Sequence, residues 1–315
     1  MVLRRVLLGL LTLFLVSILV FGATQVLPGD AASAILGNNA TPERLQALEA
    51  QLHLDRPVVS QYTTWLSGVL TGDPGESLTS GQPVGSLVST HVKNSAVLVL
   101  LASAIGTIVG VGLGVLAAAR RDGWLDHTLS VVALTLTALP EFLVALTLVL
   151  VFATLVFHVL PAVSPVPPGT SPWDNLDALV LPIATLVIVI IPYAFRMTRG
   201  AMVEALESDY VEMARLKGMS KRRVVFMHAL ANTVPVVVQV TALNLLYLAG
   251  GIVLVEYIFN YPGVGQALVS AVSDRDVPVI QLIVLTLAGF YVAVNICADV
   301  IALLATPRRR LPRSG

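Results

Sequence analysis

Six long apolar stretches constrain the fold of this chain more than any other feature of its sequence. A helix needs about 20 apolar residues to span the hydrocarbon of a membrane. Helices are favoured over strands because an open strand edge in lipid would leave backbone groups unpaired. We therefore predict an all-α membrane protein with six transmembrane helices, at residues 6–27, 95–119, 129–157, 179–195, 232–255 and 279–305.

The composition excludes the main alternatives. Hydrophobic residues make up 56% of the 315 residues and charged residues only 12%. Soluble domains carry about 25% charge, and a disordered chain combines high charge with low hydrophobicity. The single cysteine, Cys297, excludes a disulfide framework and a Cys-rich zinc site. The zero net charge gives no general attraction to nucleic acid.

The distribution of basic residues predicts the orientation. With both termini in the cytoplasm, 15 of the 19 Lys and Arg residues lie inside, as the positive-inside rule requires. The inverted topology would place those 15 outside. A cleavable signal peptide is an alternative for the first stretch, but its apolar run is long and Gly22-Ala23-Thr24-Gln25 is a poor cleavage site.

The predicted domains are an N-terminal helix (1–27), an external segment (28–94) and a five-helix core (95–315) with a basic C-terminal tail. In the external segment, Thr41 and Pro42 favour the start of a helix. A second helix, 57–70, carries an apolar stripe that includes Tyr62 and Trp65. This stripe suits either the membrane interface or packing on the outer surface of the protein itself.

The inner loop at 196–231 is long enough to fold, and its residues predict a helical hairpin. Early acidic residues, Glu204 and Glu207 among them, suit the start of its first helix, and Lys217 suits the end. Gly218 is expected to terminate that helix, and Ser220 to begin the next.

Three basic residues, 221–223, follow at the start of the second helix, where they oppose the helix dipole. An anionic lipid surface or an acidic partner would compensate them. Topology determination alone is the other interpretation.

Small residues form one face of the second predicted span. They recur every fourth position, which lets two helix backbones approach closely in lipid. Packing against a helix of this chain is favoured over packing against another subunit. The residues are Ala102, Gly106, Gly110, Gly114 and Ala118.

Several polar groups fall within or at the edge of the spans. A carboxylate in hydrocarbon is costly unless it faces a cavity or a partner. Glu256 and Asp299, with Asn295 one turn before the latter, are expected to have structural roles near the membrane faces. Glu141 is deeper and is either structural or part of a transport path, and Pro140 before it should kink the helix.

Motifs for enzymatic chemistry are missing from the sequence. It contains no G-x-x-x-x-G-K-[ST] phosphate loop, no H-E-x-x-H and no G-x-S-x-G. The five histidines are scattered, so no catalytic, metal or cofactor site is expected. A self-sufficient ion-coupled transporter and an intramembrane enzyme remain as alternatives, although no convincing inverted repeat and no clustered nucleophile and base occur.

The stretch Asp209 to Gly218, DYVEMARLKG, resembles the EAA signature on the cytoplasmic side of ABC importer permeases. Its Glu, Ala and Gly fall on Glu212, Ala214 and Gly218. Three further segments are similar to the B-type permeases of dipeptide and oligopeptide ABC importers: LPGD at 27–30, DPGESL at 73–78 and EYIFNYPGVG at 256–265. Asn295, Asp299 and Pro307-Arg308 are similar to the end of that family.

The resemblance implies a type I ABC importer permease fold in a bacterial inner membrane. It implies four kinds of partner: a second homologous permease, two ATPase subunits that use ATP and magnesium, an external binding protein and a peptide cargo. Tyr210, Glu212, Ala214, Lys217 and Gly218 would then couple the spans to the ATPases. Related permeases carry nickel, glutathione, haem or opine-like solutes, so another cargo is the main alternative.

Overall fold

The computed structural model describes residues 2–26, 41, 56–167 and 170–305. Within these ranges the regular secondary structure is helical, apart from one antiparallel bridge between Glu76 and Pro83. The chain forms two compact units that each combine distant parts of the sequence.

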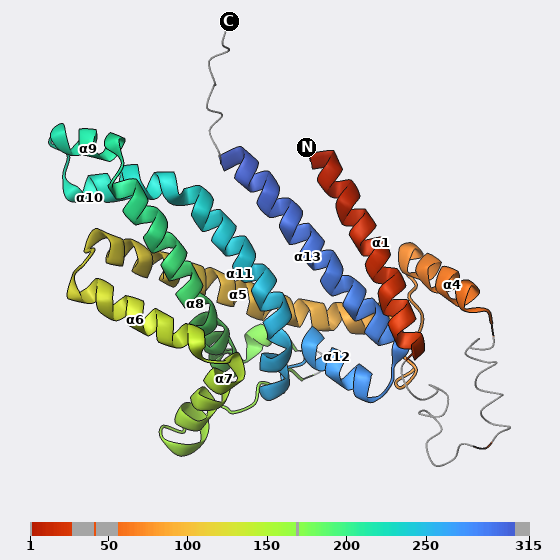
Figure 1. The fold of residues 1–315 in the computed structure, drawn as a ribbon. Helices are drawn as coiled ribbons and strands as arrows, with labels where there is room; N and C mark the ends of the chain where they lie inside the picture. The colour runs from red at the N-terminus through yellow and green to blue at the C-terminus, as the bar shows by residue number, and fades with distance from the viewer. Residues whose placement is uncertain (1, 27–40, 42–55, 168–169, 306–315) are drawn as a thin grey trace, which may run out of the picture. The chain divides into compact units, whose positions relative to one another are not determined.

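The first unit combines the N-terminal helix with segments from the middle and the end of the chain (Figure 1). Its backbone comes from the described parts of the ranges 1–97, 165–174 and 252–293. Its helices are α1 (Val2–Val26), α4 (Val58–Thr71), the first part of α5 (Val84–Ala119), the end of α11 (Leu230–Ile258), α12 (Val264–Ser273) and most of α13 (Val277–Ala305), and it also holds a short 3-10 turn at Pro172–Asp174.

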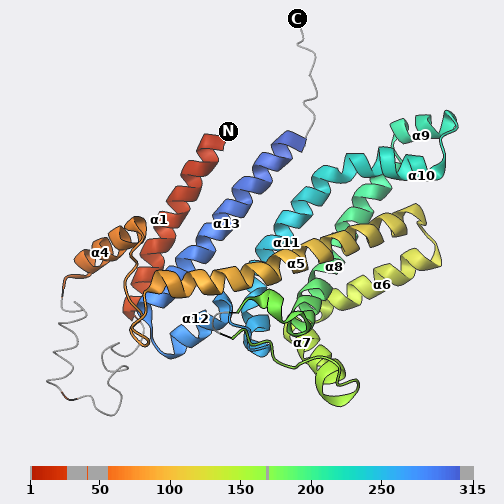
Figure 2. The ribbon, with the colours of Figure 1, turned by 180° about the vertical axis from the view of Figure 1, so that it is seen from behind.

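The second unit contains residues 98–164, 175–251 and the described part of 294–315. After the rest of α5 it holds α6 (Trp124–Ala138) and α7 (Glu141–Val149), which continues as a π-helical turn at Leu150–Leu155. Then come α8 (Leu176–Leu206), α9 (Asp209–Leu216) and α10 (Lys221–Arg223). The last of these runs through a second π-helical turn at Val224–Ala229 into α11, most of which belongs to this unit. Figure 2 shows α6 running along α8, and the two helices are in contact.

By length and composition, five of the described helices can cross a membrane, and a sixth crossing arises if α6 and α7 count as one broken span. The axes of α6 and α7 differ by 102°. Pro140 was expected only to kink this span, but the helix stops before it. Leu139 is extended, with a ψ of 124°, because the residue before a proline is forced out of the helical region.

The amphipathic helix predicted at 57–70 is confirmed as α4, and its aromatic side packs on α1. Tyr62 and Trp65 lie 5.3 and 5.8 Å from the ring of Phe21. The Tyr62 hydroxyl also forms a 2.8 Å hydrogen bond with Ser17 Oγ. The structure thus supports packing on the protein's own surface, while Leu70 at the end of the stripe stays exposed.

The small-residue face of α5 lies against α8 of the same chain. A Cβ on Gly110 would lie 2.6 Å from Ala194 Cβ and 3.1 Å from the Ile191 carbonyl oxygen. A Cβ on Gly114 would lie 2.8 Å from the Phe195 carbonyl oxygen. Gly106 faces Ile190 in the same way, and Ala102 and Ala118 are buried. The glycines therefore bring the two backbones into direct contact.

Three sequence predictions concern residues outside the described ranges. They are the helix expected after Thr41, the segment 27–30 and the basic tail that includes Pro307-Arg308.

Candidate functional site

The predicted inner hairpin is present and is built on α9, which is separated from the end of α8 by two residues. The inward side of α9 is held by Val211 and Ala214, which are buried against Val224 in the next segment. This packing fixes α9 beside α10 and the turn that follows it (Figure 1). The second helix begins at Lys221 as predicted, although the Ser220 side chain makes no capping hydrogen bond.

Gly218 ends α9 in the conformation predicted for it. Its φ is +77°, a left-handed value that L side chains rarely adopt. The Gly218 amide donates to the Arg215 carbonyl at 2.9 Å, and the Met219 amide donates to the Ala214 carbonyl at 3.3 Å. These two bonds form a Schellman motif, and Met219 adds the apolar contact that often accompanies it. The turn is therefore fixed by backbone geometry.

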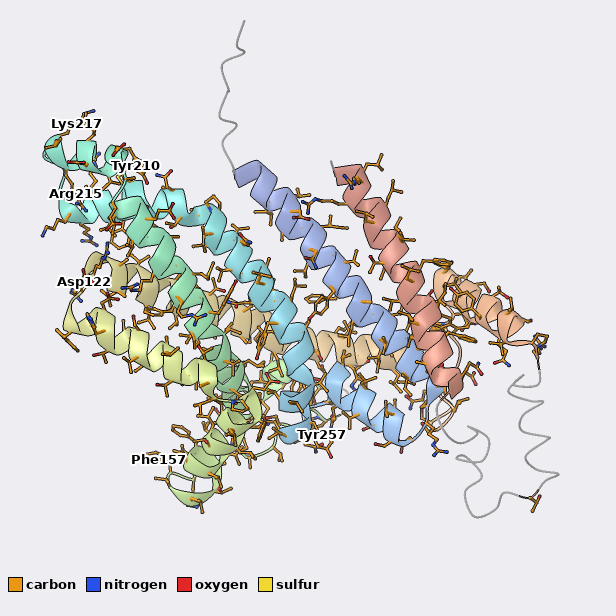
Figure 3. All side chains as sticks on the ribbon, viewed as in Figure 1. Asp122, Phe157, Tyr210, Arg215, Lys217 and Tyr257 are labelled. Atoms are coloured by element: carbon orange, nitrogen blue, oxygen red, sulfur yellow. The ribbon has the colours of Figure 1, made fainter. Side chains whose placement is uncertain are left out.

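The outward side of α9 is exposed and mixes apolar and charged groups. Tyr210, Met213 and Leu216 are 42, 55 and 76% exposed. Glu212 and Lys217 are exposed as well. Tyr210 and Lys217 lie on the hairpin at the free end of this unit (Figure 3). The motif predicted Tyr210, Glu212 and Lys217 as coupling residues but did not predict Met213 and Leu216. The helical spacing of the apolar residues Val211 and Ala214, which are buried, would have indicated that Met213 and Leu216 lie on the exposed side of α9.

Two acidic residues occupy places other than those predicted. Glu204 and Glu207 were expected at the start of the hairpin's first helix, but they lie at the end of α8, because α8 continues without a break to Leu206. Glu207 instead pairs with Arg121 from the loop between α5 and α6. Asp209 and Glu212 are the acidic residues in the first turn of α9, where the dipole favours them.

A partly buried ion pair lies near the base of the hairpin and was not predicted from the sequence. Arg199 of α8 donates to both carboxylate oxygens of Asp126 on α6, at 2.5 and 2.7 Å. The Asp122 amide donates to the same carboxylate at 3.1 Å. Asp126 is 2% exposed, and this two-pronged geometry is the strong form of an Arg–carboxylate pair. The pair ties α6 to α8.

The basic residues Lys221, Arg222 and Arg223 are all exposed at the start of α10. Their side chains make no ion pair within the described residues. Both interpretations of this cluster fit its exposed position: compensation by an anionic lipid surface or an acidic partner, and topology determination alone.

In the first unit, Glu256 lies in a fully buried cluster at the end of α11. Its Oε1 accepts a 2.5 Å hydrogen bond from Ser95 Oγ. Its Oε2 accepts from the backbone amides of Gly265 at 2.6 Å and Gln266 at 3.4 Å. Glu256 therefore caps the N-terminus of α12 from another helix, since these amides have no partner within α12. Gly263 and Gly265 leave the space that the carboxylate occupies.

The turn between α11 and α12 is held to α5 by further bonds. The Tyr261 hydroxyl donates to the Asn94 carbonyl at 2.9 Å, and Asn94 Nδ2 donates to the Pro262 carbonyl at 2.8 Å. Burial, and then the neighbouring Glu256 charge, raises the pKa of Tyr261. The phenol therefore stays protonated and can donate its hydrogen bond. Together these bonds hold the segment EYIFNYPGVG as a rigid corner between α11 and α12.

Asp276 anchors a second corner of this unit that the sequence did not reveal. Its carboxylate accepts from Ser77 Oγ at 2.5 Å, Thr79 Oγ1 at 2.7 Å and the Leu78 amide at 3.2 Å. Asp276 is 3% exposed. The segment DPGESL thus has a structural partner next to the start of α13.

Glu141 is the first residue of α7, directly after the break in the third span. Its carboxylate faces Gly251 of α11, where a Cβ would lie 2.6 Å from Oε2. Asn295 and Asp299 lie one turn apart on α13.

These features define a class of protein. The chain is a multi-pass helical membrane protein with one broken span and an exposed helical hairpin whose turn is fixed by a glycine. Among the described residues, no group of three His, Cys, Asp or Glu side chains is placed to hold a metal ion.

Comparison with known proteins places the chain within that class. Residues 110–311 match the family of binding-protein-dependent transport system inner membrane components, and residues 1–111 match the N-terminal region of such membrane components. The chain belongs to this family. It is a permease subunit of an ABC importer and a multi-pass inner-membrane protein.

Relatives are similar over almost their whole length. A Brucella abortus (strain 2308) protein assigned as a peptide transport system permease is 36% identical over 310 residues, covering 98% of both chains. The glutathione transport system permease GsiC of Escherichia coli is 34% identical over 305 residues, covering 96% of this chain and 97% of GsiC.

A solved structure shares the fold. The inward-facing MetNI methionine ABC transporter has a chain that matches with a TM-score of 0.57 and 17% identity, over 70% of this chain and 97% of that chain. This likeness supports the type I importer permease fold.

Proposed function

We propose that this chain forms, together with a second homologous permease, the membrane path through which an ABC importer carries dipeptides and oligopeptides. Relatives assigned to peptide transport, in Brucella abortus at 36% identity and in Sinorhizobium fredii at 34%, support the cargo. The α9 hairpin is the structural observation that carries the proposal, because its exposed side offers a binding surface to separate ATPase subunits.

The energy for transport comes from a pair of cytoplasmic ATPase subunits, which bind ATP and magnesium. The outward side of α9 suits a helix-in-groove contact, in which a short helix lays its apolar residues into a groove. Met213 and Leu216 supply the apolar area, and Glu212 and Lys217 supply charged groups beside it. The inward residues Val211 and Ala214 tie α9 to its own unit, so that a force on α9 is passed to α8 and α11.

An extracytoplasmic binding protein delivers the cargo at the opposite face. Glutathione is the second candidate cargo, since the 34% identity to GsiC extends over nearly the whole chain. Both candidates contain a free amino group and amide bonds, and they differ mainly in length and in the γ-linkage.

Docking of α9 is tested by removing one exposed apolar side chain. Leu216→Ser is expected to weaken co-purification of the ATPases about tenfold, because burial of a leucine contributes about 1.5–3 kcal/mol. Leu70→Ser is the matched control, since Leu70 is 78% exposed and Leu216 is 76% exposed. Leu70 lies on α4, in the segment predicted to be external, and its replacement should leave the complex intact.

An undiminished complex with Leu216→Ser and Glu212→Ala together would refute docking through α9. The cargo is tested separately, by ATP-dependent uptake of labelled di- to hexapeptides and of glutathione into proteoliposomes that hold the complete importer. Uptake of neither class would refute the proposed cargo.

A further inference from the structure

The break in the third span is exposed within this chain. Leu139 is 43% exposed and Pro140 is exposed as well. Non-helical backbone at membrane depth is tolerated only where it is buried in protein or lines a water-filled cavity. The break stands near the middle of the combined segment 124–155. It is therefore expected to face a partner subunit or an aqueous path rather than lipid.

Glu141 lies at this break with an unpaired carboxylate. The side chain is half-buried, and it makes no hydrogen bond or ion pair with any residue in the described ranges. The other buried carboxylates, those of Asp126, Glu256 and Asp276, all accept hydrogen bonds. A carboxylate at membrane depth is costly unless water or a partner reaches it, so Glu141 is the one among these four that still needs a partner.

The facing side of α11 adds a second unpaired polar group. Asn244 is 2% exposed, and its Nδ2 has no hydrogen-bond partner within the described structure. Asn244 precedes Gly251 by seven residues, which places both on one face of the helix, and Gly251 is the residue that meets Glu141. Tyr247 lies between them along the helix and is 53% exposed. An unsatisfied buried donor is costly, so this face of α11 holds a second polar group whose hydrogen bond the described residues do not supply.

We propose that Glu141 is an anionic subsite on the transport path that takes the primary ammonium group of the cargo. The proposal rests on the proposed peptide importer function. An ammonium fits because it has three donors and no acceptor, while the Glu141 carboxylate and the terminal carbonyls of α6 are acceptors. A metal ion fits less well, because no further acidic, His or Cys side chains gather there among the described residues.

The test compares one peptide with a free amino terminus and the same peptide acetylated at that terminus. Both are transported by the complete importer in proteoliposomes, and each variant is scored against wild type for each peptide. Glu141→Gln keeps the shape and removes the charge. It is expected to lower kcat/KM for the free-amine peptide about tenfold, the equivalent of about 1.4 kcal/mol, and to leave the acetylated peptide unchanged.

Two further variants separate a binding role from a structural one. Gly251→Ala keeps the charge but places a methyl group 2.6 Å from Glu141 Oε2, so it displaces the carboxylate and should lower free-amine transport in the same direction. Asp274→Asn removes an exposed carboxylate at the end of α12 and should alter neither peptide.

An equal loss for both peptides, or no loss for either, with Glu141→Gln would overturn the subsite. If Glu141→Gln does not assemble, Gly251→Ala decides by the same comparison. If the wild-type importer transports neither of the two peptides, the peptide cargo itself would be refuted instead.

Discussion

Replacement of Glu256 by glutamine should loosen α12 without unfolding the rest of the protein. Glu256 accepts hydrogen bonds from one hydroxyl and two backbone amides. A glutamine keeps one oxygen and turns the other into a donor, so at least one of these groups loses its acceptor. Ser95 cannot compensate fully, because its Oγ already accepts from the Val264 amide at 2.8 Å.

The magnitude follows from the number of groups left unpaired. One unsatisfied buried donor costs about 1–3 kcal/mol, which lowers the free energy of local opening by that amount in Glu256→Gln. Alanine would leave both short bonds unmade, those from Ser95 and Gly265, so we expect about 2–6 kcal/mol for Glu256→Ala. Local opening of this kind is smaller than global unfolding and is visible in hydrogen exchange.

The assay is hydrogen exchange with mass spectrometry on the purified importer. Amides in 264–270 should exchange about tenfold to hundredfold faster in Glu256→Gln, since each 1.4 kcal/mol is a factor of ten. Peptides from α6 and α8 should keep their wild-type rates, and Asp274→Asn provides a control carboxylate near the other end of α12. Wild-type exchange across 264–270 in Glu256→Ala would show that the carboxylate does not hold the helix.

Two further substitutions have definite expected outcomes. Gly218→Val should abolish peptide transport while insertion and expression persist, because a β-branched residue at a φ of +77° distorts the turn that ends α9; normal transport would remove the hairpin from the coupling path. Gly110→Val should lower thermal stability in detergent by about 1–3 kcal/mol or more, because its Cβ meets Ala194 Cβ at 2.6 Å; an unchanged melting temperature would mean that α5 and α8 separate easily.

The inner hairpin was predictable because its determinants are local. A residue at positive φ is most easily a glycine, and Gly218 follows directly after a short amphipathic helix. Its neighbours in the turn are within five residues of it. The amphipathic character of α4 was predictable for the same reason, since an apolar stripe needs only the period of a helix.

The corners that hold the first unit together were not predictable, because their partners are far apart in the sequence. Glu256 meets Ser95 across 161 positions, and Asp276 meets Ser77 across 199. A single sequence shows that a buried carboxylate needs donors, but not which donors it meets. The full break at Pro140 depends in the same way on neighbouring helices, since proline alone allows either a kink or an end.

The contacts within the second unit determine how far a displacement of α9 can travel. The Glu207–Arg121 pair joins the end of α8 to the loop between α5 and α6, and the Arg199–Asp126 pair joins α8 to α6 itself. Because Gly110 has no side chain, the backbones of α5 and α8 meet there without a deformable layer of side chains between them. Closely packed elements transmit strain rather than absorb it. In the proposed importer, a force on the hairpin would therefore move α5, α6 and α8 together, and the non-helical residues at Leu139 and Pro140 are where α7 can change its angle to them.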